Sequence, residues 1–166
     1  TKPSSMLAFK IGRELNIKNE TTASREFLEN ARKAKMLDGA GYVLLASMRA
    51  YEYDYEGIEE IFKETRELGF YSNEVALEEA AFLFINGKYD EAIAILSAFR
   101  QPNPDQKDQL INHRARINLA FMYAMQKDTG RLNSLVSDIP DTSPFKSAEQ
   151  RFYKILQKGE NMESTA

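Results

Sequence analysis

The sequence predicts an all-α fold in which about four antiparallel helical hairpins stack on one another and a C-terminal helix closes the stack. Three observations lead to this prediction. Apolar residues recur at helical spacings of three and four, turn-forming residues separate the apolar segments, and the whole pattern repeats at intervals of about 34 residues. The chain of 166 residues is long enough to form one domain with a substantial core.

The clearest repeat covers residues 73–104. Two stripes at helical spacing identify its helices: Ala76, Ala80 and Leu83 in the first, then Tyr89, Ala92, Ile93 and Leu96 in the second. The segment Asn86-Gly87-Lys88 lies between the stripes and is typical of a turn. This repeat is therefore predicted to be a helical hairpin.

The same pattern occurs twice earlier in the chain, at equal steps, and once later, at a longer step. Small residues recur in the first helix of each pair and large apolar residues in the second: Gly12, Ala46, Ala80 and Ala120, then Leu28, Phe62, Leu96 and Val136. The six additional residues of the longer step are placed in residues 101–106, which are rich in turn formers.

In chain order, the predicted helices are 5–17 with 21–36, 40–52 with 55–69, 73–86 with 89–100, 107–126 with 129–138, and a closing helix over 145–158. Ser143 and Pro144 are typical of the start of that last helix. Its apolar face is expected to cover the open end of the stack: Phe145, Ala148, Phe152, Ile155 and Leu156. We expect a single helical-repeat domain over residues 1–158 and a flexible tail over 159–166.

The stretch from Ala76 to Pro104 resembles a tetratricopeptide repeat. The resemblance rests on a small residue in the first helix, the Gly87-Lys88-Tyr89 turn, Ala92 and the closing Pro104. The other repeats depart from the family pattern at Tyr53 and Lys127, which replace the turn Gly, and at Ile58 and Leu132, which replace the Ala. The resemblance implies a right-handed superhelical stack whose first helices line a concave face used to bind another protein.

A second stretch, residues 41–70, is similar to a pentatricopeptide repeat, whose family binds single-stranded RNA. The interval, which is one residue shorter than that of the pentatricopeptide family, argues against that family. Residues 38–79 also hold eleven acidic and three basic groups, a net charge of −8, and RNA phosphates would be repelled there. The sequence therefore favours a protein or peptide partner over nucleic acid.

The residue inventory argues against an enzyme. The chain has no Cys and a single His, His113, which excludes a cysteine nucleophile and a pair of histidine metal ligands. His113 is expected to be a partly solvated polar residue. We expect no catalytic residue, no metal and no cofactor. Because no apolar run approaches the roughly 20 residues of a membrane helix and no secretory signal is visible, we also expect no membrane insertion and a cytoplasmic location.

The surface expected to bind a partner consists of outward positions on the first helices: Arg13, Asn16, Ser47, Tyr51, Leu77, Ala81, Phe84, Phe121 and Met125. Phe9, Val43 and Ile117 extend the same rows. The tetratricopeptide proteins that grip a C-terminal carboxylate use Lys, Asn and Arg at these places. Here only Arg13 and Asn16 are of that type, so the resemblance implies an apolar groove.

The sequence leaves open whether the aromatic groove residues bind a partner or fill the core. Phe84, Phe121 and Met125 fit a binding surface, but they also fit a core between neighbouring hairpins. Tyr51, Tyr53 and Tyr55 alternate beside the acidic block and are expected at a rim that a basic partner would meet.

The sequence thus predicts an adaptor or scaffold that holds a partner helix or extended peptide in an apolar concave groove. Two alternatives remain: an RNA-binding module of the pentatricopeptide type, and the regulatory or assembly domain of a larger protein.

Overall fold

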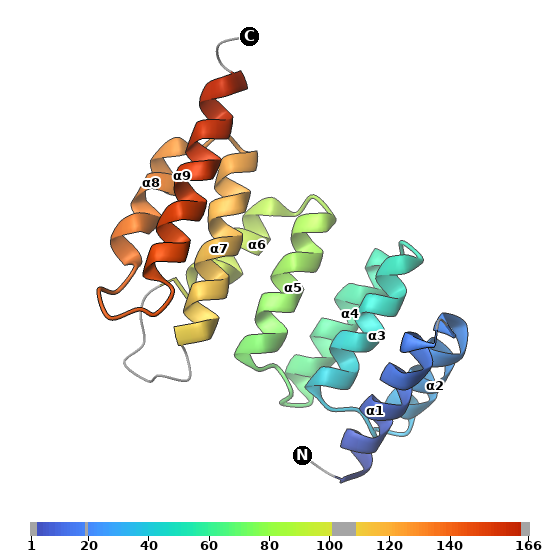
Figure 1. Ribbon diagram of the computed structural model, residues 1–166. Coiled ribbons are helices and arrows are strands. Elements are labelled where there is room, and N and C mark those ends of the chain that lie inside the picture. Colours follow the sequence, from blue (N-terminus) through green and yellow to red (C-terminus); the bar gives the residue numbers. More distant parts are fainter. Residues whose placement is uncertain (1–2, 19, 101–108, 164–166) are drawn as a thin grey trace. The chain divides into compact units, whose positions relative to one another are not determined.

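The computed structural model describes residues 3–18, 20–100 and 109–163, and all regular structure in these ranges is helical (Figure 1). The expected closing Pro104, the insertion over 101–106 and the last tail residues, 164–166, lie outside the described residues. Contacts within the chain divide it into two compact units, Thr1–Phe82 and Leu83–Ala166. The single domain expected over 1–158 therefore stays a prediction.

Unit 1 contains four helices and most of a fifth: α1 (Pro3–Ile17), α2 (Thr21–Lys33), α3 (Gly39–Tyr51), α4 (Tyr55–Glu67) and α5 (Asn73–Ile85). The helix α1 packs against α2, and α3 packs against α4. These two pairs are the first two predicted hairpins. The helix α3 also packs against α1 and α2, so the hairpins share one core.

Unit 2 contains the end of α5 and five further elements: α6 (Tyr89–Ser97), α7 (Gln109–Met125), α8 (Thr129–Ser134), the 3₁₀ helix η2 (Leu135–Asp138) and α9 (Lys146–Glu163). The helix α7 is central to this unit, because it packs against α6, α8 and α9. The last helix ends at Glu163, five residues beyond the end predicted at 158.

The ends of the helices confirm the repeat interval in the backbone itself. The residues after α3, α5 and α7 have positive φ angles: 59° at Tyr53, 74° at Gly87 and 58° at Lys127. The residues after α2 and α4 do the same, with 54° at Lys35 and 74° at Gly69. Left-handed residues commonly end helices. Within each series the positions recur at the steps that the sequence predicts.

The helix starts follow the same interval. Asp38 caps α3 by accepting a hydrogen bond from the Gly41 backbone nitrogen at 3.0 Å. Ser72, one repeat later, accepts one from the Val75 nitrogen at 3.3 Å at the start of α5. Such caps satisfy backbone donors that have no partner within the helix.

The recurring small residues all lie in the core. Ala46, Ala80 and Ala120 are 0% exposed, and Gly12 is buried. A Cβ atom on Gly12 would lie 2.7 Å from Cδ2 of Leu28, and the Gly12 carbonyl accepts a hydrogen bond from the Ser24 hydroxyl at 2.8 Å. The helices α1 and α2 therefore cross at Gly12 with no room for a side chain.

One sequence prediction in unit 2 is wrong by a single position. In the fourth hairpin Leu135 is 0% exposed, whereas Val136 is 40% exposed. The reason is that the α-helix gives way to η2 at Leu135, and a 3₁₀ helix places residues three apart on the same side. Leu135 therefore falls in line with the buried Leu132.

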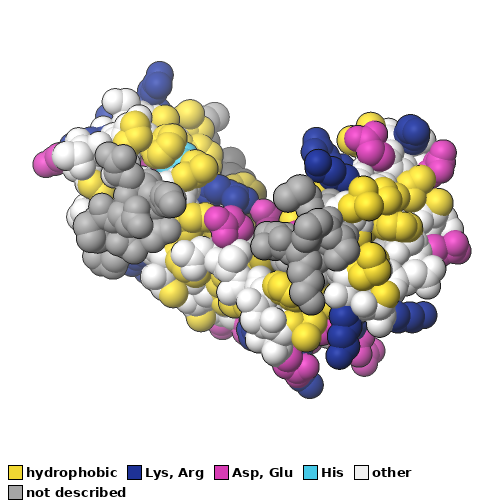
Figure 2. Space-filling view, turned by 90° about the horizontal axis from the view of Figure 1, so that it is seen from below, with side chains coloured by type: hydrophobic (Ala, Val, Ile, Leu, Met, Phe, Trp, Pro, Cys, Tyr) yellow, Lys and Arg dark blue, Asp and Glu magenta, His cyan; other side chains and the backbone are white. Residues whose placement is uncertain are grey.

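The closing helix α9 is also rotated from its predicted phase. Of the predicted apolar face, Phe145, Phe152 and Leu156 are half-buried, whereas Ala148 is exposed and Ile155 is 66% exposed. Glu149 and Tyr153, which were not predicted there, are buried at 0% and 1%. On the face drawn in Figure 2, hydrophobic side chains reach the surface in several patches, and acidic side chains lie beside basic ones along its edges. None of the described helices is long and apolar enough to cross a membrane.

Candidate functional site

The nine predicted partner-binding residues lie at three levels of burial. Arg13, Tyr51, Phe121 and Met125 are exposed, and Asn16, Ser47, Ala81 and Phe84 are half-buried. Leu77 is 1% exposed. A side chain so deeply buried has no surface to present, so Leu77 is a core residue rather than a contact residue.

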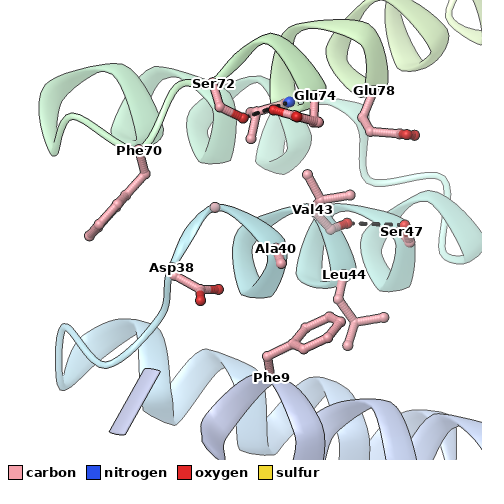
Figure 3. A pocket seen from close by; sticks show the side chains of 12 residues that line it. Phe9, Asp38, Ala40, Val43, Leu44, Ser47, Phe70, Ser72, Glu74 and Glu78 are labelled. Atoms are coloured by element: carbon pink, nitrogen blue, oxygen red, sulfur yellow. Dashed lines mark hydrogen bonds between the residues drawn. The ribbon is translucent and has the colours of Figure 1, made fainter. Parts of the chain in front are cut away.

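Unit 1 carries a surface hollow of about 640 Å³, and of the nine predicted partner-binding residues Ser47 lines it. It is lined from three places: Phe9 on α1, residues 38–47 around the start of α3, and residues 70–78 around the start of α5. Figure 3 shows Phe9 beside Leu44, with Val43 between them and the side chains of α5. The expected groove residues Phe9, Val43 and Ser47 thus meet in one concavity.

Apolar side chains form the floor of the hollow, and polar groups beside it have hydrogen-bond partners within the chain. The Ser47 hydroxyl donates to the Val43 carbonyl at 3.0 Å, and Asp38 is engaged in capping α3. Val43 and Leu44 are partly buried against the unit 1 core. A Cβ on Gly39 would lie 3.0 Å from the Phe70 carbonyl oxygen, so glycine lets α3 begin close to the loop that leads to α5.

The charges around the hollow are of one sign. Asp38, Glu74 and Glu78 are among its twelve lining residues, and none of those twelve is Lys, Arg or His. The lining residues that surround the start of α5 were not among the predicted groove residues: Phe70, Ser72, Glu74, Val75 and Glu78. Sequence reasoning missed them because they belong to a loop and a helix start, which become part of the wall only when α5 packs beside α3.

A second apolar surface lies in unit 2. Phe84 contacts Phe121 edge to face, with ring centroids 5.9 Å apart, and Tyr89 at 5.2 Å. Phe121 is 45% exposed, Tyr89 42% and Met125 61%. These aromatic side chains therefore form a cluster in which Phe84 is half-buried and Phe121 and Tyr89 are partly open to solvent.

Tyr51 and Tyr53 project from the end of α3 and are 74% and 78% exposed. Tyr55 is half-buried, and its ring lies 6.5 Å from that of Tyr53. The backbone of Tyr53 is left-handed, a conformation that disfavours side chains larger than glycine. With 78% of its surface exposed, Tyr53 contributes little to the core of unit 1.

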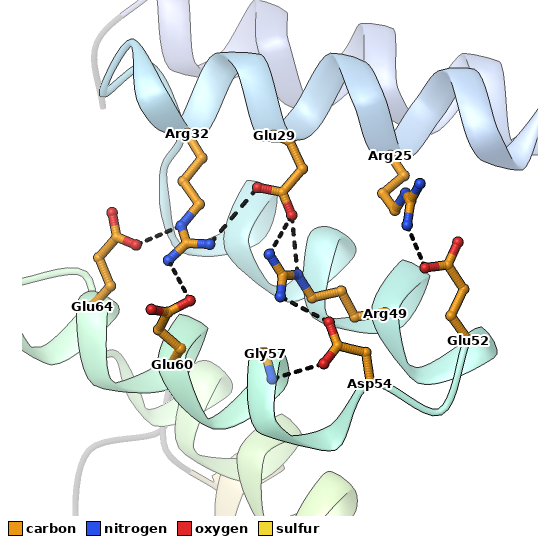
Figure 4. A network of polar contacts seen from close by, with 9 residues as sticks. All are labelled: Arg25, Glu29, Arg32, Arg49, Glu52, Asp54, Gly57, Glu60 and Glu64. Atoms are coloured by element: carbon orange, nitrogen blue, oxygen red, sulfur yellow. Dashed lines mark hydrogen bonds and ion pairs between the residues drawn. The ribbon is translucent and has the colours of Figure 1, made fainter.

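Part of the acidic block of residues 38–79 is paired with arginines. Along α2, three arginine–carboxylate groups bridge to α3 and α4 (Figure 4). The pairs are Arg25 with Glu52, Arg32 with Glu60 and Glu64, and Arg49 with Glu29 and Asp54. Four of the eleven carboxylates of this block are therefore paired with arginines in these groups: Glu52, Asp54, Glu60 and Glu64. Two of the three arginines, Arg25 and Arg32, lie outside the block and offset two of its eight excess negative charges.

These ion pairs have close geometry. Arg32 Nε lies 2.5 Å from Glu64 Oε2, and Arg49 Nη2 lies 2.6 Å from Glu29 Oε1. Burial lowers the pKa of Arg32, but the hydrogen bonds to Glu64 and Glu60 outweigh it, so the pKa is raised and the guanidinium stays charged. The network ties the two hairpins of unit 1 together, which is a structural role.

Unit 2 contains a buried ionic cluster that the sequence did not predict. Arg116 is 1% exposed and Glu149 0% exposed, and they meet through two hydrogen bonds of 2.8 Å. Tyr153 donates to the same carboxylate at 3.0 Å, and His113 Nδ1 lies 2.8 Å from it. The His113 ring is also stacked on Phe145, with centroids 4.2 Å apart. His113 is thus engaged in packing α9 against α7.

Among the described residues, no group of three or more His, Asp or Glu side chains is arranged to hold a metal ion. No family model, no curated protein and no solved structure matches this chain significantly.

Proposed function

We propose that this chain is a protein-interaction module of the tetratricopeptide-like, helical-repeat type, which holds a partner helix or extended peptide against the first helices of its hairpins. The observation that carries the proposal is the hollow of unit 1. It collects apolar side chains from two successive first helices, α1 and α3, and its volume of about 640 Å³ falls within the range of ligand pockets.

The lining of the hollow suits a protein partner that inserts apolar side chains into it. Its apolar floor, formed by Phe9, Val43 and Leu44, offers burial to the apolar face of a helix or to alternate residues of an extended peptide. The surrounding carboxylates supply polar anchoring points at the rim. The exposed aromatic cluster at Phe84 and Phe121 offers a second contact of the same chemical kind.

The repeat register extends this proposal to the arrangement of the hairpins. Because successive hairpins recur at a nearly constant interval, we propose a right-handed superhelical stack in which α9 serves as the terminal cap. Small residues at equivalent points of α1, α3, α5 and α7 support such stacking, since each permits close approach of a neighbouring helix.

The test is selection of a displayed library of helical and extended peptides on the full chain. We expect enriched peptides to carry apolar residues at helical or alternating spacing. The variant Val43→Gln, which makes the floor of the hollow polar, should weaken their binding at least tenfold, or about 1.4 kcal/mol. Lys63→Gln, on the exposed face of α4, is the matched control and should leave binding unchanged.

Two outcomes would count against the proposal. One is the enrichment of no peptide, and the other is binding that Val43→Gln does not weaken. Retention of a single-stranded RNA pool at low salt, lost at high salt, would instead support the RNA-binding alternative.

A further inference from the structure

The outer face of α9 combines basic and apolar side chains. The exposed residues between positions 147 and 158 lie at helical spacing along one side: Ser147, Ala148, Arg151, Lys154, Ile155 and Lys158. Three of these six carry positive charge and none carries negative charge. Ile155 is 66% exposed in their midst. The terminal helix of a repeat protein ordinarily presents a polar outer face, and on this one an isoleucine lies among three cations.

The hollow of unit 1 has the complementary chemistry. It is apolar at its floor, and its charged lining residues are the carboxylates Asp38, Glu74 and Glu78. Glu74 and Glu78 are four residues apart on α5, as Lys154 and Lys158 are on α9. Four residues span about 6 Å along a helix axis, so the two pairs of charges have the same spacing. Ile155 follows Lys154 directly and is offset from it by about 100° around the helix. The isoleucine and the lysine can therefore contact neighbouring parts of one surface, the isoleucine an apolar part and the lysine an acidic part.

We propose that α9 of one copy of this chain docks into the unit 1 hollow of a second copy, with Ile155 on the apolar floor and the lysines facing Glu74 and Glu78. The inference rests on the proposed function, because it takes the hollow to be a helix-binding site. It goes further by naming the occupant, which is a second copy. The two contacting surfaces are different, so the interface is heterologous. A pair of copies retains a free hollow on one copy and a free α9 on the other. The chain therefore assembles head to tail.

The experiment is sedimentation velocity of the full chain over a range of concentrations, at about 0.02 M and about 1 M salt. Between these two salt concentrations the Debye screening length falls from roughly 20 Å to about 3 Å. We expect the average mass to rise above that of the monomer with concentration at low salt and to return toward the monomer at high salt. A mass that stays monomeric at all concentrations would overturn the proposal.

Neutral variants locate the interface. Glu74→Gln with Glu78→Gln alters the hollow, and Lys154→Gln with Ile155→Ser alters α9. Each double variant alone should raise the dissociation constant of self-association at least tenfold. Mixed in equal amounts, the two should form a one-to-one complex that does not grow, because only one intact hollow and one intact α9 remain between them. A mixture that stays monomeric, or variants that assemble like the wild type, would overturn the proposal.

Two controls separate this interface from general effects. Lys63→Gln with Glu67→Gln changes one charge of each sign on the exposed face of α4 and should leave self-association intact. Helical circular dichroism and melting of every variant must match the wild type. If the hollow variant is destabilised, the α9 variant still tests the interface, because Lys154 and Ile155 are exposed. Absence of self-association together with retained binding of library peptides would overturn this inference alone, whereas loss of both would overturn the proposed function as well.

Discussion

Arg116 on α7 and Glu149 on α9 form a bidentate ion pair that is closed off from solvent, with both nitrogen–oxygen distances at 2.8 Å. The pair decides how α9 is rotated. A buried guanidinium without a carboxylate is strongly unfavourable, so α9 turns Glu149 inward and leaves the apolar Ile155 outside. The apolar periodicity of α9 alone therefore does not predict which of its residues are most deeply buried.

Removing one partner of this pair should be costly. We expect Glu149→Gln to lower the free energy of unfolding by about 3–5 kcal/mol, because it leaves the charge of Arg116 uncompensated in the interior. The double variant Arg116→Met with Glu149→Gln should lose less than the sum of the two single variants by roughly 1 kcal/mol or more. Urea unfolding measures these values. Additive losses below about 1 kcal/mol each would show that the pair is not the anchor of α9.

The same carboxylate should make stability depend on pH. Burial raises the pKa of Glu149, but the hydrogen bonds from Arg116 and His113 outweigh it and the net pKa lies below the ordinary value of 4.5. A carboxylate with a depressed folded pKa stabilises the protein fully above the unfolded pKa, and this stabilisation is lost as the pH falls through the folded pKa. Thermal melting between neutral pH and pH below 4.5 should therefore show a smaller acid-induced decrease for Glu149→Gln than for the wild type. Glu67→Gln, an exposed control, should follow the wild-type profile.

Replacing glycine by alanine at two helical positions should change the free energy of unfolding in opposite directions. Alanine at Gly12 should destabilise by about 1–3 kcal/mol, because its Cβ would lie 2.7 Å from the fully buried Leu28. Alanine at Gly130 should stabilise by about 0.5–1 kcal/mol, because its Cβ would meet only Asp128 Oδ1 at 3.6 Å and alanine favours the helix. Equal effects in denaturant unfolding would contradict the close crossing of α1 and α2.

The left-handed turns make a second matched pair. Tyr53→Gly should raise the free energy of unfolding by roughly 0.5–1 kcal/mol, since glycine relieves the strain at φ 59° at some cost in chain entropy. Gly87→Ala, at φ 74°, should lower it by about 1 kcal/mol although the added Cβ would meet no atom within 4 Å. Thermal melting checks both. If Tyr53→Gly also weakens peptide binding, the aromatic side chain is retained at this strained position for contact with a partner.

The aromatic cluster of unit 2 can be tested on binding. Phe121→Glu should leave helical circular dichroism unchanged, because the ring is 45% exposed, and it should abolish pull-down of a partner that uses this surface. Asn133→Glu, an exposed position on α8, serves as the control. A collapse of the helical signal would instead assign Phe121 to the core.

The sequence by itself determined the helical class, the hairpins of unit 1 and the interval between repeats. These follow from local rules: apolar residues at helical spacing, side chains that cap helix starts, and left-handed residues that end helices at regular steps. The buried positions of Gly12, Ala46, Ala80 and Ala120 could be predicted for the same reason.

Tertiary structure alone decided which faces are buried where polar groups intervene. Charge counts along the chain could not show that two arginines of α2 pair with carboxylates at the end of α3 and on α4, because these partners lie 27 to 32 residues apart. The lining of the hollow by the segment before α5 and the burial of Glu149 have the same origin. Each depends on contacts between segments that are far apart in the sequence. The free energy of burying a charge or of packing side chains around the hollow is set by these contacts, and local sequence patterns do not contain them.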